Sequence, residues 1–279
     1  MLSPMNRVVQ AFERLRACRG KALMPFVTAG DPSLAATSAV LAAAADAGAA
    51  VCEVGIPFSD PIADGPVIQE SMTWALNRGT KVAGVFDAVR QARQRGGAAM
   101  NSLGLMAMVS YSIVHRLGPD RFVADAKAAG FDGLIVPDLP VEACEGLRRH
   151  IDAAGLVLSL LIAPTTTRDR ARQIAQACSG FVYVVSRAGI TGEQTALPPE
   201  LPQRIEALRA VTDLPIAVGF GISTAAQVRQ VCEVADAAIV GSAMVRGLAS
   251  LREAAPDTIA EHAGALVREL AGGLTPAAT

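Results

Sequence analysis

Residues 120–136 read DRFVADAKAAGFDGLIV, a stretch in which a glycine joins a helical pattern to a short apolar run. Apolar residues recur at helical spacing over Asp120–Ala129, and Gly130 can adopt the left-handed conformation that ends many helices. Gly133–Val136 then has no polar residue, which is typical of a strand covered on both faces in a parallel sheet. The stretch therefore predicts a helix, a turn and a buried parallel strand.

The same order of helix, glycine and apolar run recurs along the chain. We expect eight strands, at Ala22–Thr28, Val51–Gly55, Leu103–Val109, Gly133–Val136, Leu156–Ile162, Phe181–Val185, Ile216–Phe220 and Ala237–Val240. Helical spacing covers Leu34–Ala47, Val67–Asn77, Val85–Arg95, Asp120–Ala129, Glu142–Ala154, Arg168–Ala177, Pro199–Ala210, Ala225–Val234 and about 250–270.

Eight such units without a linker predict an α/β fold, a single (β/α)8 TIM barrel domain over residues 1–279. A length of 279 residues also allows two small domains, and a doubly wound sheet more often has five or six strands. We expect an N-terminal helix and an extra helix after the second strand as additions to the barrel. Residues 272–279 are small and polar enough to form a frayed tail.

Composition excludes several classes of protein. Hydrophobic residues make up 51% of the chain and charged residues 18%, a balance that forms a large core rather than a disordered chain. The formal net charge of −1 supplies no field for nucleic acid. Charged residues interrupt every apolar run that could span a membrane, and also the segment from Arg7 to Lys21 where a secretory signal would lie. We therefore expect a cytoplasmic protein.

The cysteines and histidines give no sign of a metal or redox site. Five widely spaced cysteines include no C-x-x-C pair, and the three histidines lack H-E-x-x-H spacing. We expect reduced thiols and no metal.

The loops that follow the strands are where a barrel of this kind holds its reactive groups. Glu53 lies among apolar neighbours in the second expected strand, where desolvation would raise its pKa toward the range useful for proton transfer. It is a candidate general acid or base; the alternatives are a pair with a barrel lysine or arginine, or a side chain turned outward to cap a helix.

The next loop, residues 55–66, reads GIPFSDPIADGP. Three prolines and two glycines restrict its backbone, so it presents its two aspartates in a defined shape. Either Asp60 or Asp64 can be functional, but an aspartate beside proline or glycine is more often a turn cap.

Glycine-bearing loops follow the last three strands, at residues 186–192, 219–223 and 241–242. Backbone N–H groups there, at the start of a short helix, form a phosphate site in many barrels. We expect a small phosphorylated substrate, although glycine is also the usual residue of tight turns.

The chain resembles the tryptophan synthase alpha subunit family over roughly Met5 to Ser250. Five motifs carry the resemblance: PFVTAGDP at 25–32, EVGIPFSDPIADGP at 53–66, VPDLPVE at 136–142, GITG at 189–192 and VGFGIS at 218–223. The resemblance implies retro-aldol cleavage of indole-3-glycerol phosphate to indole and glyceraldehyde 3-phosphate. It also implies that this chain needs no cofactor, and that a beta subunit carrying pyridoxal phosphate uses the indole in an α2β2 complex.

The resemblance assigns roles to matching positions. Glu53 matches the acid/base that protonates indole C3, and Asp64 matches the carboxylate that binds the indole N–H. The remaining assignments are an indole wall of Phe26, Met108 and Phe220, a nearby Tyr183, phosphate donors Gly192, Gly221, Gly241 and Ser242, and Thr191 in a mobile loop that closes over Asp64. Matching partner contacts are Pro57, Asp60 and Pro140, with Ser112 in the same region.

One stretch departs from the family, because Ser110–Val114 lacks the asparagine and proline that members usually carry there. A missing proline is expected to free this loop, which faces the beta subunit in the family, and so to weaken the complex. Three alternatives remain open: a freestanding lyase that releases indole, a catalytically idle barrel, and a phosphosugar isomerase or epimerase.

Overall fold

The computed structural model describes residues 6–61, 64–186, 198–219 and 221–274. Within these residues all strands are parallel and form one sheet in the order β5-β4-β3-β2-β1-β9-β8-β7-β6. The strands are β1 (Ala22–Thr28), β2 (Val51–Gly55), β3 (Gly104–Met108), β4 (Gly133–Ile135), β5 (Val157–Ser159), β6 (Leu161–Ile162), β7 (Val182–Val185), β8 (Ile216–Gly219) and β9 (Ala237–Val240).

The expected fifth strand, Leu156–Ile162, is divided at Leu160 into β5 and β6. β5 pairs with β4, and β6 pairs with β7, so this one segment joins the two ends of the sheet. The result is the predicted TIM barrel, with nine strand segments among the described residues in place of eight uninterrupted strands.

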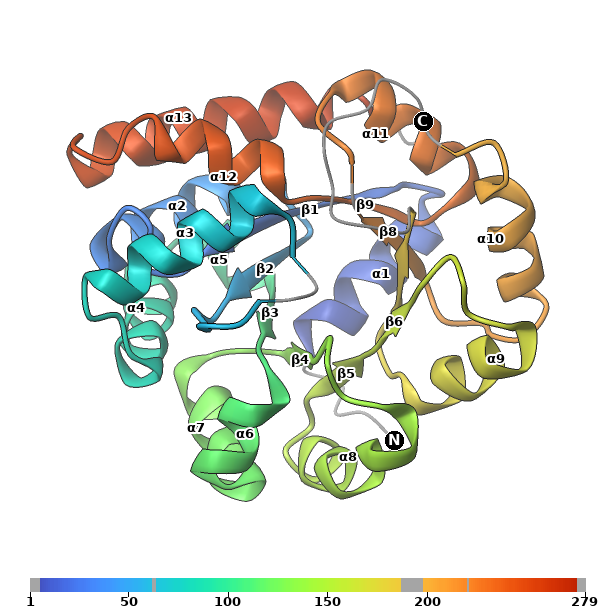
Figure 1. The fold of residues 1–279 in the computed structure, drawn as a ribbon. Coiled ribbons are helices and arrows are strands. Elements are labelled where there is room, and N and C mark those ends of the chain that lie inside the picture. The colour runs from blue at the N-terminus through green and yellow to red at the C-terminus, as the bar shows by residue number, and fades with distance from the viewer. Residues whose placement is uncertain (1–5, 62–63, 187–197, 220, 275–279) are drawn as a thin grey trace.

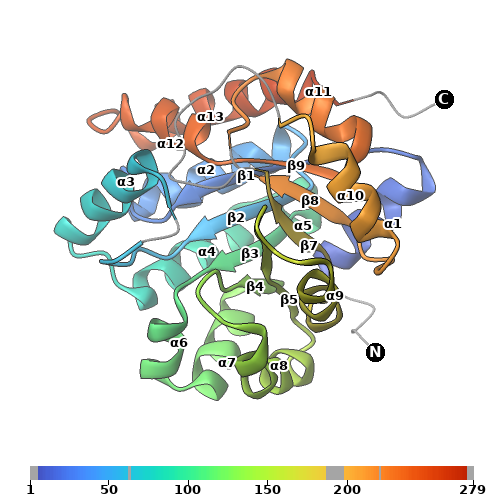
Figure 2. The ribbon, with the colours of Figure 1, turned by 45° about the vertical axis from the view of Figure 1, so that its right-hand side comes forward.

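Helices surround the barrel (Figures 1 and 2). They are α1 (Arg7–Ala17), α2 (Leu34–Asp46), α3 (Pro66–Asn77), α4 (Val82–Arg95), α5 (Ala98–Ser102), α6 (Tyr111–Leu117), α7 (Pro119–Ala129), α8 (Cys144–Ala153) after a 3-10 turn (Val141–Ala143), α9 (Arg168–Ala177), α10 (Leu201–Arg209), α11 (Ala225–Val234), α12 (Ser242–Ala249) and α13 (Pro256–Ala271). The expected helix at about 250–270 starts only at Pro256, and α5 and α6 were not expected from the sequence.

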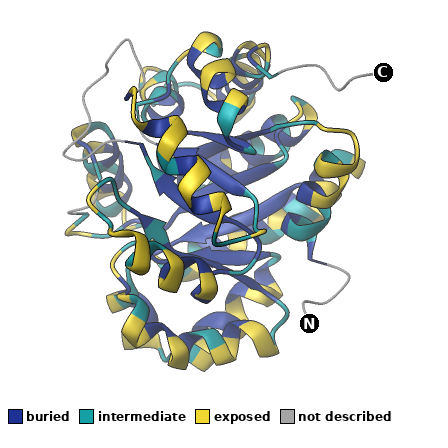
Figure 3. Cartoon of the chain, turned by 90° about the vertical axis from the view of Figure 1, so that its right-hand side faces the viewer, coloured by how far each residue is buried: buried dark blue, intermediate teal, exposed yellow. Residues whose placement is uncertain are grey.

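The apolar runs of the sequence are buried on both faces, as predicted (Figure 3). Alternate residues of β1 enter different apolar layers: Met24 and Phe26 belong to the barrel interior, whereas Leu23 and Val27 pack in the layer between strands and helices. Helix α1 covers one end of the interior, where Phe12 lies 5.8 Å from Phe181 between ring centroids.

A buried ion-pair network fastens α1 and α4 to this end of the barrel. The carboxylate of Asp132, 1% exposed, accepts hydrogen bonds from Arg7 Nη1 at 3.0 Å and Arg93 Nη2 at 2.9 Å. It also accepts the backbone N–H of Leu105 at 2.9 Å. Burial lowers the pKa of Arg93 to about 10, while Asp132 opposes this shift.

Replacing Asp132 with asparagine is expected to lower the free energy of unfolding by about 3–5 kcal/mol, because a buried arginine would lose its counter-charge. Urea denaturation monitored by circular dichroism measures this loss. The matched control is Asp87→Asn on α4, where the pair with Arg90 is exposed and is expected to contribute less than about 1 kcal/mol. Equal losses in both variants would contradict a special role for the Asp132 network.

No described helix is long and apolar enough to cross a membrane. The five cysteines are free thiols, and only Cys18 is exposed.

Candidate active site

Glu53 projects from the middle of β2 into the barrel and is fully buried. Neither carboxylate oxygen has a hydrogen-bond partner among the described residues, so the alternative of a structural ion pair with lysine or arginine finds no support in them. Burial, and secondarily the negative charge of Asp64, raise the pKa of Glu53 well above its ordinary value. Glu53 therefore keeps its proton to a higher pH than an ordinary glutamate does, and it can donate that proton to a bound molecule.

Asp64 lies two residues before α3 and is half-buried. Its N–H donates to the carbonyl of Pro61 at 3.0 Å, and its own carbonyl accepts from Gln69 Nε2 at 2.8 Å. The hydrogen bonds recorded for Asp64 within the described residues thus use its backbone. Burial raises the pKa of its carboxyl group from 3.8 to about 6. Asp64 is consequently ionised at neutral pH and available to a cationic or N–H group.

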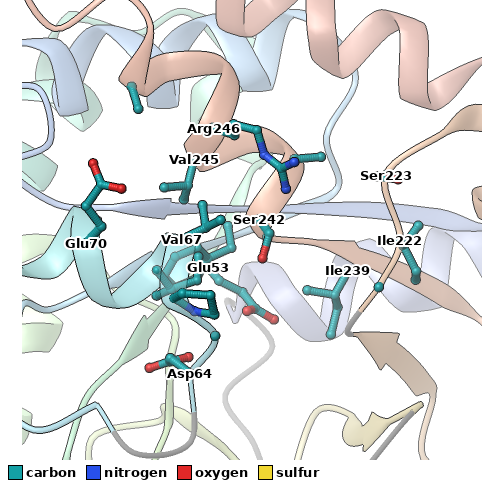
Figure 4. Close-up of a pocket in the computed structure, with 18 of the residues that line it drawn as sticks. Glu53, Asp64, Val67, Glu70, Ile222, Ser223, Ile239, Ser242, Val245 and Arg246 are labelled. Atoms are coloured by element: carbon teal, nitrogen blue, oxygen red, sulfur yellow. The ribbon is translucent and has the colours of Figure 1, made fainter. Parts of the chain in front are cut away.

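Both carboxylates line one cavity of about 500 Å³ at the end of the barrel (Figure 4). Phe26, Met108 and Tyr183 contribute its apolar and aromatic wall. Gly221, Gly241 and Ser242 line it as well. The structure therefore brings together the predicted proton-transfer residues, the predicted ring pocket and part of the predicted phosphate site.

The ring pocket depends on two glycines that leave space for aromatic side chains. A Cβ atom at Gly55 would lie 2.5 Å from Phe26 Cζ, and one at Gly219 would lie 2.5 Å from Tyr183 Oη. Burial, followed by the charges of Glu53 and Asp64, raises the pKa of Tyr183, so its hydroxyl stays protonated. Phe26 and Tyr183 are buried among other core residues, and they also form the cavity wall.

The anion side of the cavity is formed by the loops after β8 and β9. Gly241 is the residue before α12 and Ser242 is its first residue, so N–H groups of the first turn, which have no carbonyl partner within the helix, lie at the cavity. Gly221 has φ +77, a left-handed conformation that favours glycine. Thr191, Gly192 and Phe220 lie outside the described residues.

Several residues that line the cavity were not predicted from the sequence, among them Glu70, Arg246 and Arg252. Arg246 follows Ser242 by one helical turn, and this i, i+4 spacing was a signal that could have identified it. Arg252 had no such signal, because its neighbours come from distant parts of the chain.

A second cavity of about 270 Å³ adjoins the first, and Asp64 and Met108 line both. Asp60 and Ser112, two of the predicted partner contacts, line this second cavity and are exposed. Pro140 is also exposed, whereas Pro57 is buried. The described surface thus offers three of the four predicted contacts to a partner.

The segment Ser110–Val114 is not the free loop that its missing proline predicted. Ser110 is the N-cap of α6, and its hydroxyl donates to Asp138 Oδ2 at 2.7 Å. The backbone N–H of Tyr111 donates to Asp138 Oδ1 at 2.8 Å. The segment is already held in a helix. The entropy cost of ordering it when a beta subunit binds, which the missing proline predicted, is therefore not expected.

Replacing Gly241 with valine is expected to raise the KM for a phosphorylated substrate about tenfold, equivalent to about 1.4 kcal/mol of binding free energy. A Cβ atom at this position would lie at an ordinary contact distance of 3.9 Å from Phe26, a residue of the cavity wall, so the added bulk is expected on the cavity side. Gly221 is a less suitable site, since its positive φ would add backbone strain.

Steady-state kinetics and inhibition by inorganic phosphate measure the effect of Gly241→Val, with the value of kcat expected to change little. Gly146→Val on α8 is the matched control, since a Cβ atom there meets no atom within 4 Å. If KM and the inhibition by inorganic phosphate are unchanged in Gly241→Val, the loop at Gly241 is not part of the anion site.

No group of three or more His, Cys, Asp or Glu side chains in the described part of the chain is arranged to bind a metal ion.

Comparison with known proteins identifies the family. The profile of the family described as tryptophan synthase alpha chain matches residues 12–273. A curated tryptophan synthase alpha chain from Rhodopirellula baltica is 47% identical over 267 residues, which cover 93% of this chain and 95% of the relative. One from Microcystis aeruginosa is 43% identical, covering 88% and 91%.

Solved structures agree with this assignment. Tryptophan synthase subunit alpha from Legionella pneumophila superposes with a TM-score of 0.85 at 36% identity, covering 96% of this chain and 98% of the other. A chain of tryptophan synthase from M. tuberculosis, in an aminoacrylate-bound form, gives a TM-score of 0.82 at 30% identity, covering 96% and 99%. The fold, the cavity with its two carboxylates and these similarities lead to one conclusion: the chain belongs to the tryptophan synthase alpha chain family.

Proposed function

We propose that Glu53 and Asp64 carry out the reaction of this family, the cleavage of indole-3-glycerol phosphate to indole and glyceraldehyde 3-phosphate. The observation that carries the proposal is a fully buried glutamate, without a hydrogen-bond partner in the described part of the chain, that shares one cavity with an ionisable aspartate. The reaction needs a protonated acid to donate a proton and an anionic carboxylate to stabilise the positive charge that follows.

In the first step the Glu53 carboxyl group donates its proton to indole C3. The ring becomes an indolenine cation whose N–H the Asp64 carboxylate binds, so charge that develops in the transition state meets a fixed opposite charge. In the second step the Glu53 carboxylate takes the proton of the adjacent side-chain hydroxyl. The carbon–carbon bond then breaks, its electron pair returns to the ring, and the hydroxyl carbon becomes the aldehyde.

The rest of the cavity fits the two ends of this substrate. Phe26, Met108 and Tyr183 supply an apolar wall for the indole, together with Phe220 by its position in the family motif. Gly221, Gly241 and Ser242 offer backbone N–H groups to the phosphate, with Gly192 and Thr191 assigned by the motif alone.

We also propose that this chain is a single cytoplasmic domain and that it works in an α2β2 complex with a beta subunit, which would hold the pyridoxal phosphate. Asp60 and Ser112, which line the second cavity and are exposed, supply the contact surface together with the exposed Pro140. The Asp138 contacts that order α6 support docking, because less of the surface must be ordered on binding.

Adding a beta subunit from the same source is expected to increase indole release in a saturable manner, and the two chains are expected to sediment together. Ser112→Arg should require about a tenfold higher concentration of beta subunit, equivalent to about 1.4 kcal/mol, because it places a bulky charge in the contact. Ser102→Arg on α5, also exposed, is the matched control.

The outcomes separate the alternatives. Substantial lyase activity without acceleration or co-sedimentation would select a freestanding enzyme. Negligible activity under both conditions would select an idle barrel. Turnover of a phosphosugar without indole release would select an isomerase or epimerase.

A further inference from the structure

Arg252, in the turn between α12 and α13, connects two parts of the chain that lie far apart in the sequence. Its Nε and Nη2 atoms donate to Asp31 Oδ1 and Oδ2, each at 2.9 Å, in a two-pronged pair. Its Nη1 atom donates to Glu70 Oε1, also at 2.9 Å. Only 15% of the Arg252 side chain is exposed, and 3% of the Asp31 side chain. Arg252 therefore joins the loop after β1 to helix α3.

Trp74, one turn further along α3, strengthens this connection. The Arg252 guanidinium carbon lies 4.3 Å from the centre of the Trp74 ring, a cation–π contact. The indole N–H of Trp74 donates to the carbonyl of Pro32 at 3.3 Å, next to Asp31. Two successive turns of α3 are thus attached to the same loop through Arg252.

The position of α3 in turn determines the position of Asp64. One residue, Gly65, separates Asp64 from the first residue of the helix. From the first turn, Gln69 Nε2 donates to the backbone carbonyl of Asp64 at 2.8 Å and more weakly to that of Pro61 at 3.4 Å. A shift or rotation of α3 would therefore move Asp64 with it.

Arg252 also lines the active-site cavity, which raises the alternative that it binds the substrate phosphate itself. Its charge argues against this alternative. Asp31 and Glu70 place two carboxylates on one guanidinium, so the cluster offers no excess positive charge to an anion. Glu70 lies at the rim of the cavity (Figure 4), where it would repel a phosphate that approached Arg252.

We propose that Arg252 is a positioning residue, which holds α3 against the loop after β1 and thereby keeps the Asp64 carboxylate in place opposite Glu53. This proposal rests on the proposed function of Asp64. Arg252 is not one of the reacting groups. In this role it controls the rate of the reaction and not the binding of the substrate.

The test compares Arg252→Gln with Arg78→Gln in the full chain. Arg78 is a matched control, because its guanidinium carbon also lies 4.3 Å from the centre of the Trp74 ring but its ion pair is with the exposed Glu253. We expect kcat for indole release to fall about tenfold in Arg252→Gln, since misplacing a catalytic group by 1 Å can lower a rate by about 10². KM and inhibition by inorganic phosphate should stay close to wild type in both variants.

A second readout separates positioning from general stability. The acidic limb of the kcat–pH profile should move below pH 6 in Arg252→Gln, because a loosened Asp64 becomes hydrated and its pKa returns toward about 4. Arg252→Lys keeps the charge but lacks the fork that reaches both carboxylates, so it should restore the rate only in part.

Hydrogen–deuterium exchange of residues 64–77 provides a measurement that does not depend on activity. Faster exchange in Arg252→Gln than in Arg78→Gln is expected. If wild type released no indole but this exchange difference remained, the proposed function would fail while the attachment of α3 would stand. If Arg252→Gln does not fold, Glu70→Gln, whose side chain is 71% exposed, should show the same effects at smaller size.

Three results would overturn the proposal. A rise in KM and weaker phosphate inhibition with unchanged kcat would make Arg252 a phosphate ligand. Equal effects in the Arg78 and Arg252 variants would assign the loss to Trp74 stacking. Unchanged kcat, pH profile and exchange would show that α3 holds Asp64 without Arg252.

Discussion

Replacing Glu53 with glutamine is expected to lower kcat for indole release by about 10²–10⁴-fold, the usual contribution of a general acid or base. The amide has nearly the same volume as the carboxyl group but carries no transferable proton. Because no described residue forms a hydrogen bond with either oxygen, the substitution breaks no hydrogen bond in that part of the structure. KM should change little, and inorganic phosphate should inhibit as in wild type.

The same substitution is expected to stabilise the fold at neutral pH. Glu53 has a folded pKa well above its ordinary value of 4.5, so between these two values the unfolded chain releases a proton that the folded chain keeps. Stability of the wild type therefore falls as the pH rises through this range. Glutamine does not titrate, so the melting temperature of the variant should exceed that of wild type at pH 7.

The stability gap between Glu53→Gln and wild type should close near pH 4, where the carboxyl group is protonated in both states. Thermal melts at several pH values, together with steady-state kinetics, test both expectations. An unchanged rate would exclude Glu53 as the acid. A variant less stable than wild type at every pH would show that the Glu53 carboxyl group makes a stabilising contact, contrary to its lack of a hydrogen-bond partner among the described residues.

Replacing Asp64 with asparagine should lower kcat by about 10²–10³-fold, the size of effect seen when a group that stabilises transition-state charge is removed. The amide can still accept a hydrogen bond from the indole N–H but no longer offsets the positive charge that develops on the ring. For wild type, the rate should decline below about pH 6, because burial raises the pKa of Asp64 to about 6 and only the carboxylate is effective.

Asp60→Asn is the matched control for Asp64→Asn when activity is measured without a beta subunit. Asp60 lies four residues earlier in the same loop, is exposed, and accepts a hydrogen bond from Ser59 Oγ at 2.6 Å. The rate of the Asp60→Asn variant should remain close to that of wild type. Equal rates for Asp64→Asn and wild type would leave Asp64 with a structural role only.

Much of the barrel could be predicted from the sequence, because its signals are local. A strand covered on both faces needs a continuous apolar run, and β1, β2 and β9 lie where such runs were found. Glu53 was identifiable for the same reason, since a lone carboxylate inside a buried strand stands out. Helix boundaries were less accurate. Helix α6 was missed although Ser110 caps it locally, and the further contact of Ser110 with Asp138, 28 positions away, leaves no local signal.

The sequence by itself determined the strand pattern, the barrel and the identity of the two candidate carboxylates. It did not determine their environment. That Glu53 has no partner among the described residues, and that Asp64 shares its cavity, follows from how β2 and the start of α3 face the same space. The Arg252 cluster likewise joins residues 31, 70 and 252, whose separation along the chain leaves no periodic signal. Tertiary structure decided these features because desolvation and charge pairing depend on distance in space, whereas sequence patterns report only the period of a local element.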